Sequence, residues 1–305
     1  MSRPPSPLRS MLRLAARGVR VSGAAPALDV TSPRRKAARE CAEIYVDPAH
    51  VRDYARATGG DAVTAFFDAR PATPPFYCAT WETALAMEML AGLETPLPLG
   101  AMVHVSTEMV WARPLTPGDA IRCRVELDRV ERTPRGLKMT MLSRNWMGAG
   151  QLCSQGTSVF MLRTRTPHDA EPPRLDRPAP AADGIAWSEL ARWPLSAGAG
   201  RRYARVSGDY NPIHLWPWTA RPFGFRAPIL HGYATAARTA HTLIAQRLRG
   251  DPGALRRMRI VFRAPLPLPS TAVLLTAEDA AGHRFRVASP HGPTVYAEGT
   301  YGGAA

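Results

Sequence analysis

The chain repeats one order of sequence features twice, and this repetition limits the folds that it can adopt. Two apolar segments that follow a proline, 75–91 and 228–246, have the length and pattern of buried helices. Their starting prolines are about 150 residues apart, and so are Pro114 and Pro265, which mark bends after an extended segment. Landmarks at a nearly constant interval indicate an internal duplication, although the identity between the two copies is low.

Each copy also places extended segments after its apolar helix. They are 103–119, 120–132, 136–147 and 151–162 in the first copy, and 258–270, 272–279, 283–289 and 294–301 in the second. Alternating or continuous apolar residues between glycine and proline breaks are typical of β-strands. A shorter helical segment opens each copy, at 48–61 and at 200–209. The pattern predicts an α+β fold in which an antiparallel sheet wraps around a long helix in each copy.

Composition divides the chain into four parts. Residues 1–40 carry nine basic and two acidic side chains, and we expect a basic, largely disordered tail. An amphipathic stretch at 10–20 leaves a transit peptide or a membrane-surface helix as alternatives to a plain tail or docking helix. Five prolines in 164–184 disfavour a helix or central strand and predict a linker. The body is therefore predicted to consist of two units, 41–163 and 185–303.

The net charge of +14 does not by itself indicate a nucleic-acid-binding protein. Only two of the 39 basic residues are lysine, an arginine bias typical of a GC-rich genome. A basic body can attract coenzyme A phosphates or an acidic acyl carrier protein, and it identifies neither. No apolar run is long enough to span a bilayer. Four scattered cysteines favour reduced thiols in a cytoplasmic protein over disulfides or a zinc site.

The residues that carry chemistry gather in 207–214, with the sequence SGDYNPIH. Its turn-forming residues predict a loop, in which Asp209 and His214 lie five residues apart with Ser207 and Asn211 beside them. A carboxylate and an imidazole at this spacing can hold a water molecule and move its protons, as addition of water to a double bond requires. The same pattern fits a common turn in which Asp209 caps a helix, so the spacing alone leaves both interpretations open.

A second segment, 223–232, supplies a place for a thioester oxygen. Pro228 precedes the apolar helix, so 230–232 is expected at or near the first helical turn, where backbone N–H groups are unpaired. Gly232 has no side chain to block a carbonyl oxygen. This turn is therefore a candidate oxyanion hole for an enolate.

The other histidines and the neighbouring tryptophans are given structural roles. We expect His231 to be a packed or hydrogen-bonded residue at the helix start, and His241 to be a core or interface histidine. Trp216 and Trp218 are expected to pack against the protein rather than stack on a base. The remaining histidines have no matching carboxylate and are assigned no role: His50, His104, His168, His283 and His291.

The string YARVSGDYNPIH at 203–214, followed by FGFRAPILHG at 223–232, closely resembles the hydratase-2 motif of MaoC-like dehydratases. The similarity extends through the first copy and covers roughly 44–303. It is especially close to double-domain (3R)-hydroxyacyl-thioester dehydratases of the mycobacterial type. The resemblance implies a double hotdog fold.

The resemblance also implies a reaction and a set of roles. Asp209 and His214 would bind and activate water, and the Gly232 amide would contact the thioester oxygen, with support from Ser207 and Asn211. The reaction would be reversible hydration of trans-2-enoyl thioesters to (3R)-3-hydroxyacyl thioesters, on coenzyme A or an acyl carrier protein, in fatty-acid metabolism. We therefore expect a hydro-lyase with no metal and no cofactor. It would have no nucleic-acid partner and no stable membrane insertion, and a homodimer is compatible with this family.

The first copy departs from the motif at 58–65, where it has the sequence TGGDAVTA. Asp61 corresponds to Asp209, but the position five residues later is Phe66 instead of histidine. We expect the first copy to be inactive, completing the sheet and shaping an acyl tunnel, which leaves one site per chain. Two alternatives are a thioesterase, since hotdog folds also host that chemistry, and a non-catalytic binder of acyl thioesters or nucleic acid. The intact motif disfavours both.

Overall fold

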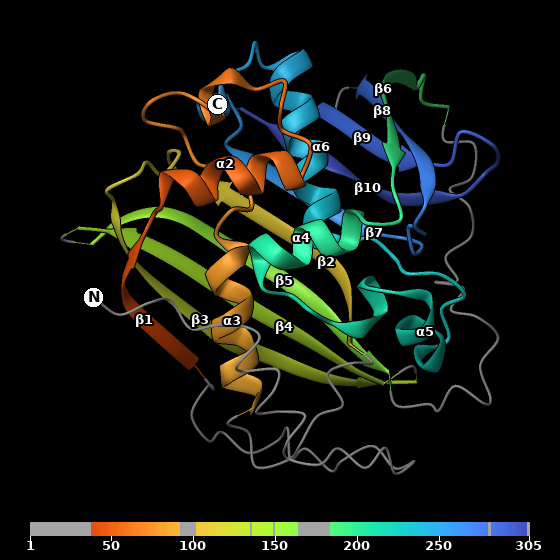
Figure 1. Cartoon of the computed structure of the whole chain (residues 1–305), viewed down its shortest axis with the longest axis horizontal. Coiled ribbons are helices and arrows are strands. Elements are labelled where there is room, and N and C mark those ends of the chain that lie inside the picture. The colour runs from red at the N-terminus through yellow and green to blue at the C-terminus, as the bar shows by residue number, and fades with distance from the viewer. Residues whose placement is uncertain are drawn as a thin grey trace.

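The computed structural model describes residues 38–91, 102–134, 136–148, 150–163, 184–279 and 282–303. These residues form ten strands: β1 (Ala38–Tyr45), β2 (Met102–Trp111), β3 (Ala120–Thr133), β4 (Gly136–Met147), β5 (Gln151–Arg163), β6 (Ser188–Leu195), β7 (Arg257–Phe262), β8 (Ser270–Asp279), β9 (Gly282–Ala288) and β10 (Val295–Gly302). The strands join in one antiparallel sheet with the order β1-β3-β4-β5-β2-β7-β10-β9-β8-β6 (Figure 1).

The strand order is the same on both sides of the central β2–β7 pair. Moving outward, β5, β4, β3 and β1 follow β2, while β10, β9, β8 and β6 follow β7. The central strands are antiparallel, with Thr107 opposite Ile260 and Met109 opposite Met258. The two halves of the chain are therefore arranged as a duplication predicts, and one strand pair merges their sheets.

Two apolar helices lie against this sheet, one in each half (Figure 1). They are α3 (Ala79–Ala91) and α6 (Gly232–Arg247). Residues three or four positions apart share a helix face, and Leu85 with Met89 in α3, like Ala236 with Ala240 in α6, are almost fully buried. The expected α+β architecture, a sheet wrapped around a long helix in each half, is confirmed, and this is a double hotdog fold.

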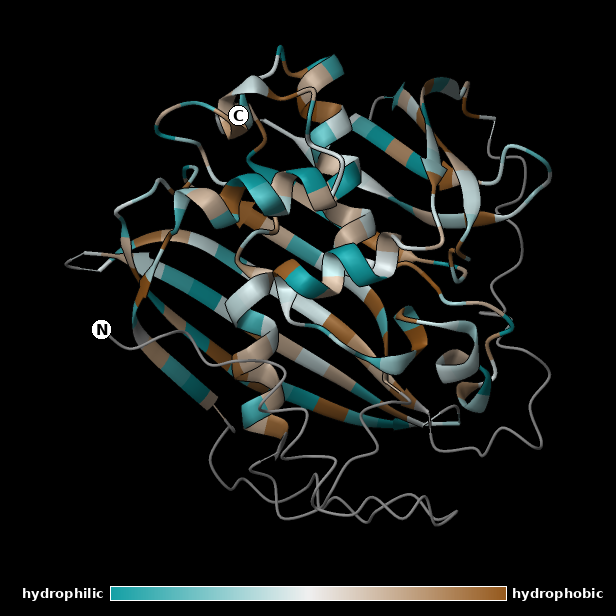
Figure 2. Cartoon of the chain, in the orientation of Figure 1, coloured by the Kyte–Doolittle hydropathy of each residue, from teal (hydrophilic) through white to brown (hydrophobic). Residues whose placement is uncertain are grey.

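The strands show the alternation expected for a sheet with one covered face. Figure 2 shows hydrophobic and hydrophilic residues alternating along several strands. In β4, every second residue from Met139 to Asn145 is buried, including Ser143, whereas the residues between them are partly exposed. The covered face of the N-terminal half therefore contains polar as well as apolar side chains.

Two shorter helices, α2 (Pro48–Ala57) and α4 (Ala199–Ser207), occupy matching places in the two halves. They pack against each other, and the rings of Tyr54 and Tyr203 lie 6.0 Å apart between centroids. His50 of α2 also contacts the backbone oxygen of Val206 at 2.8 Å through Nε2. These contacts fix the end of α4, from which the motif at 207–214 continues.

Both apolar helices begin four residues later than the sequence predicts. Before α6, Leu230 donates its N–H to the oxygen of Leu266 at 2.8 Å, and Pro228 accepts from Leu268 at the same distance. This segment is extended because its backbone pairs with another chain segment, and the helix starts only at Gly232. Before α3, Phe76 takes a positive φ of 66°, which is incompatible with a continuous helix.

Two edge strands were not expected from the sequence. β1 begins at Ala38, inside the predicted tail, and β6 contains Pro194, which is tolerated because β6 has a neighbour on one side only. The rest of the predicted tail and the predicted linker, 1–37 and 164–183, lie outside the described residues. Among the helices that are described, none has both the length and the apolar character that crossing a membrane requires.

The expectation that Trp216 and Trp218 pack against the protein is wrong for Trp218 and holds only in part for Trp216. Their side chains are 40% and 68% exposed. They flank Pro217 at the start of α5 (Pro217–Ala220), a single turn whose buried residue is Ala220. A helix this short buries one face only, and both indoles lie outside that face.

Candidate active site

The loop after α4 carries the predicted catalytic pair. Gly208 ends the helix in the left-handed conformation (φ 73°), which glycine adopts without strain. Asp209 follows, and Asn211 caps the short 3-10 helix η4 (Pro212–His214) by accepting from the N–H of Ile213 at 3.4 Å. His214 therefore lies at the end of a helical turn within the predicted loop.

Side-chain hydrogen bonds fix the backbone around Asp209. Ser207 Oγ accepts from the N–H of Asp209 at 3.2 Å, and Asp209 Oδ1 accepts from the N–H of Asn211 at 3.1 Å. Ser207 is buried, whereas Asp209 and Asn211 are partly exposed. Local bonds of this kind stabilise a turn, so the loop presents the Asp209 carboxylate in one orientation.

The tautomer of His214 follows from its hydrogen bond. Nδ1 lies 2.8 Å from the backbone oxygen of Ile229, and because a carbonyl oxygen can only accept, Nδ1 carries the proton of the neutral ring. Nε2 then has a free lone pair. Burial lowers the pKa of His214, and the carboxylate of Asp209 only partly opposes this shift. At neutral pH the ring is a neutral base.

His231 joins the pair from the residue before α6. Its Nε2 lies 3.0 Å from the backbone oxygen of Asp209, so Nε2 donates and Nδ1 holds the lone pair. The ring stacks on that of His214, with centroids 3.7 Å and planes 26° apart. Burial, and after it the neighbouring His214, holds the pKa of His231 well below its ordinary value. His231 is the hydrogen-bonded residue at the helix start that the sequence predicts.

Three side chains meet at the candidate site, those of Asp209, His214 and His231. One polar atom of each lies within 4.8 Å of the corresponding atoms of the other two. A carboxylate beside a neutral imidazole can hold one water molecule and exchange its protons. All three residues can also bind metal ions. The stacking of the two rings, however, places their in-plane lone pairs in nearly parallel planes, whereas a tetrahedral ion needs the lone pairs to converge. The arrangement fits a water molecule better than a metal ion.

Gly232 is the first residue of α6, so its N–H has no carbonyl partner within the helix. Two side chains leave no room for a larger residue at this position. A Cβ atom on Gly232 would lie 2.7 Å from Nδ1 of His104 and 3.1 Å from Cζ of Phe262. Only glycine therefore fits between the helix start and these rings.

His104 was assigned no role from the sequence, yet β2 places it against Gly232. Its Nε2 lies 3.1 Å from the oxygen of Ser106, so Nε2 donates and the Nδ1 lone pair faces the glycine. Burial lowers the pKa of His104 to about 3. The N-terminal half thus contributes a neutral imidazole to the wall of the site. No signal in the sequence could identify it, because the contact depends on the pairing of β2 with β7.

The corresponding place in the N-terminal half is filled by apolar packing. Phe66 ends the 3-10 helix η1 (Thr64–Phe66), as His214 ends η4, and it is fully buried. Its ring packs on His241 of α6, with centroids 5.0 Å apart. Asp61, the counterpart of Asp209, is exposed. The motif residues of this half therefore bring no carboxylate and imidazole together.

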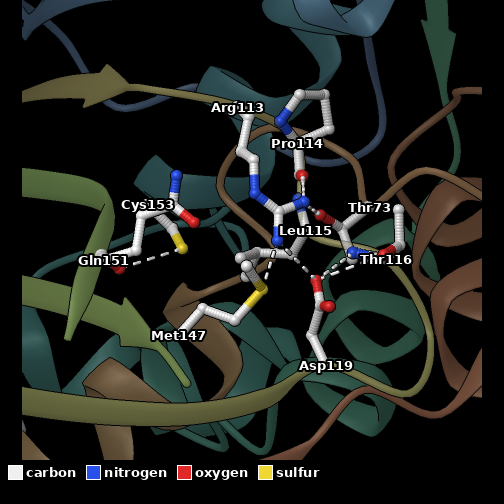
Figure 3. Close-up of polar contacts among 9 residues, drawn as sticks. All are labelled: Thr73, Arg113, Pro114, Leu115, Thr116, Asp119, Met147, Gln151 and Cys153. Atoms are coloured by element: carbon white, nitrogen blue, oxygen red, sulfur yellow. Dashed lines mark hydrogen bonds and ion pairs between the residues drawn. The ribbon is translucent and has the colours of Figure 1, made fainter. Parts of the chain in front are cut away.

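A shallow hollow lies mainly in the N-terminal half, lined by Phe76, Trp111 and Arg113 among others, with Pro252 and Leu255 from the C-terminal half. None of its lining residues belongs to the Asp209 cluster. Figure 3 shows Arg113, one of the lining residues, bonded to Asp119 at 3.4 Å and in contact with Met147. Structural contacts occupy this guanidinium, so the hollow is a mainly apolar space.

The sequence of this chain is similar to those of several known proteins. Residues 190–289 match the model of the MaoC like domain, and residues 36–148 match that of the FAS1-like, dehydratase domain region. The chain is 31% identical to 3-hydroxyacyl-thioester dehydratase X of Mycobacterium tuberculosis over 280 residues, 91% of each chain. It is 29% identical to peroxisomal enoyl-CoA hydratase 2 of Arabidopsis thaliana over 152 residues, 47% of this chain and 49% of that protein.

A solved structure is similar over most of the chain. The crystal structure of HtdX from Mycobacterium tuberculosis aligns with a TM-score of 0.68 and 25% identity, covering 88% of this chain and 100% of that one. Fold and cluster together define a double hotdog protein with a polar site in its C-terminal half. The chain belongs to the MaoC-like dehydratase family.

Proposed function

We propose that this protein is a hydro-lyase that reversibly hydrates trans-2-enoyl thioesters to (3R)-3-hydroxyacyl thioesters. The observation that carries the proposal is the Asp209 carboxylate within 4.8 Å of the neutral His214 ring, close to the start of α6. The relatives named above act as a dehydratase of 3-hydroxyacyl thioesters and as an enoyl-CoA hydratase. The four cysteines, all within the described residues, form no disulfide, which fits a cytoplasmic protein.

The tautomer of His214 gives the pair distinct roles. In hydration, Asp209 accepts one hydrogen bond from the water molecule while Nε2 of His214 takes the other proton as oxygen bonds to C3. The resulting imidazolium lies beside the Asp209 carboxylate, which stabilises it. His214 then returns the proton to C2, so one water molecule adds across the double bond and the enzyme is restored.

Gly232 has the complementary task at the thioester oxygen. Negative charge builds on this oxygen as the enolate forms, and an unpaired N–H at a helix start lies at the positive end of the helix dipole. The contribution of Ser207 and Asn211 is indirect. Their hydrogen bonds with Asp209 hold the turn that carries its carboxylate. Dehydration follows the same path in reverse, with His214 removing the C2 proton.

The acyl chain is proposed to extend into the N-terminal half. His104 contacts Tyr233 at 4.6 Å between ring centroids, Tyr233 contacts Phe76 at 6.3 Å, and Phe76 contacts Trp111 at 5.2 Å. This aromatic series leads from Gly232 to the hollow that Phe76 and Trp111 line. Apolar side chains along this line suit an alkyl chain, whose burial is favourable.

The test is a purified-enzyme assay with trans-2-enoyl-CoAs of increasing length. Loss of the conjugated enoyl absorbance together with a (3R)-3-hydroxyacyl product supports the proposal. Release of free coenzyme A without hydration identifies a thioesterase instead. Absence of either reaction, on both coenzyme A and acyl carrier protein thioesters, would overturn the enzymatic assignment.

A further inference from the structure

Large apolar side chains are exposed at few places in the described part of the chain. Only Tyr45, Trp216 and Trp218 belong to this group there, and the two tryptophans lie together. Their rings stack with centroids 5.7 Å apart and planes 17° apart. Trp216 is two residues from His214, so this indole surface lies beside the proposed site.

The indole pair is held in place by its own neighbours. The guanidinium of Arg201 lies over the Trp216 ring at 5.6 Å, and Arg201 also donates to the oxygen of Leu215 at 2.8 Å. Thr219 Oγ1 accepts from the N–H of Trp216 at 3.1 Å and donates to the oxygen of Pro212 at 2.7 Å. A flat aromatic surface fixed in this way loses little entropy when a second ring stacks on it.

The charge around the pair is strongly positive. Between Ala199 and Gly232 the sequence contains five arginines and one acidic residue, the proposed catalytic Asp209. Four of these arginines are exposed, and none has a carboxylate partner among the described residues: Arg202, Arg205, Arg221 and Arg226.

Arginines elsewhere in the described sheet are paired in a different way. Arg257 lies against Glu108, Arg263 against Glu298, and Arg284 against Asp279. The segment 199–232, which contains the indole pair, therefore carries an excess of guanidinium groups without a carboxylate partner, and this excess attracts anions.

We propose that Trp216 and Trp218, with the exposed arginines of the segment 199–232, bind the nucleotide end of a coenzyme A thioester. The adenine stacks on the exposed indole surface, and the phosphates are neutralised by the free guanidinium groups. This inference rests on the proposed function and names the carrier of its substrate. Two indoles offer a face of the size of one base, whereas a carrier protein would require a much broader surface.

The test compares two substrates that share one acyl group. One is a trans-2-enoyl-CoA, and the other is the same acyl group on pantetheine, which lacks the nucleotide. Trp218→Ala is expected to lower kcat/KM for the coenzyme A substrate about tenfold through KM. The loss should be confined to the substrate that bears the nucleotide. Tyr45→Ala removes the other large exposed aromatic side chain and is the matched control.

A direct binding measurement separates this inference from the proposed function. Titration calorimetry with adenosine 3′,5′-bisphosphate should show binding to the wild type that weakens about tenfold in Trp218→Ala and weakens with salt in the wild type. This readout does not depend on turnover. Failure of all thioesters to react would sink the hydratase proposal alone.

Three results would overturn the inference. The first is an equal loss on both substrates, which means that Trp218 only supports the loop. The second is no loss on either substrate and no bisphosphate binding. The third is a loss confined to an enoyl-acyl carrier protein, which would assign the surface to a protein carrier.

Discussion

The two halves of the molecule place different rings at the same point of one scaffold. In the C-terminal half, η4 ends at His214, which stacks on His231 and lies beside Asp209. In the N-terminal half, η1 ends at Phe66, which packs on His241 of α6. The fold therefore supplies a buried position at the end of a short helix in each half. The residue at that position decides whether it belongs to a reaction site or to the hydrophobic core.

The largest expected effect comes from the proposed pair itself. His214→Ala removes the base and Asp209→Asn removes the carboxylate, so each should lower kcat by roughly 10²–10⁴-fold or abolish turnover. The matched change in the other half, Asp61→Asn, should leave kcat within about twofold. Initial rates with an enoyl-CoA measure kcat for all three variants, and circular dichroism checks that each variant is folded. Near-normal rates in either pair variant would contradict one site per chain.

A smaller loss is expected at the proposed oxyanion site. Gly232→Ala forces a Cβ to within 2.7 Å of His104 and should lower kcat/KM by about 10²-fold. Gly302→Ala is the control, since a Cβ there meets nothing within 4 Å.

A double variant tests whether the clash with His104 causes the loss at Gly232. Adding His104→Ala to Gly232→Ala should restore part of the lost kcat/KM, because it removes the ring that the new Cβ meets. If the double variant is no better than the single one, the clash with His104 is not the cause.

A loss of about tenfold in kcat is expected for His231→Phe. Phenylalanine keeps a ring against His214, as Phe66 does against His241, but it loses the bond to the Asp209 backbone of about 1 kcal/mol. His231→Gln, which can donate to the same oxygen, should recover much of the rate. Equal losses in both variants would mean that the shape of the ring matters more than its hydrogen bond.

The smallest effect concerns stability below neutral pH. Burial lowers the pKa of His241 to about 3, whereas an unfolded histidine titrates near pH 6.5. Between these values the unfolded chain binds a proton that the folded chain does not, so the free energy of unfolding falls as pH falls.

His241→Phe isolates this contribution. It should reduce the pH dependence of the free energy of unfolding by at most about 1.4 kcal/mol per pH unit between pH 6.5 and 3. Urea unfolding at several pH values measures the slope. An unchanged slope would show that His241 is protonated in the folded protein over this range.

The apolar patterns, repeated at a nearly constant interval, were enough to predict the two long helices, most strands and the fold class. The edge strands were missed for a physical reason. The first three residues of β1 were assigned to a charged tail, because an edge strand can keep its charges in solvent, where Glu40 pairs with Arg122 and Arg124. The distribution of charge along the sequence does not distinguish a charged edge strand from a charged tail.

The site was predictable where its residues are close in sequence, and not beyond. Asp209, His214 and Gly232 stand in one motif, and the structure brings the pair together. His104 reaches Gly232 only through the pairing of β2 with β7. Trp216 and Trp218 were misjudged because a hydrophobic side chain on a single helical turn has no pattern that shows which way it faces.

Hydration of an enoyl-CoA in water enriched with oxygen-18 shows directly whether the oxygen of water joins C3 of the substrate. Mass spectrometry is expected to find the label in the C3 hydroxyl of a (3R)-3-hydroxyacyl-CoA, and His214→Ala is expected to yield no labelled product. Label in a free carboxylate, with release of coenzyme A, would contradict the proposed function, because water would then have attacked the thioester carbonyl instead of the double bond.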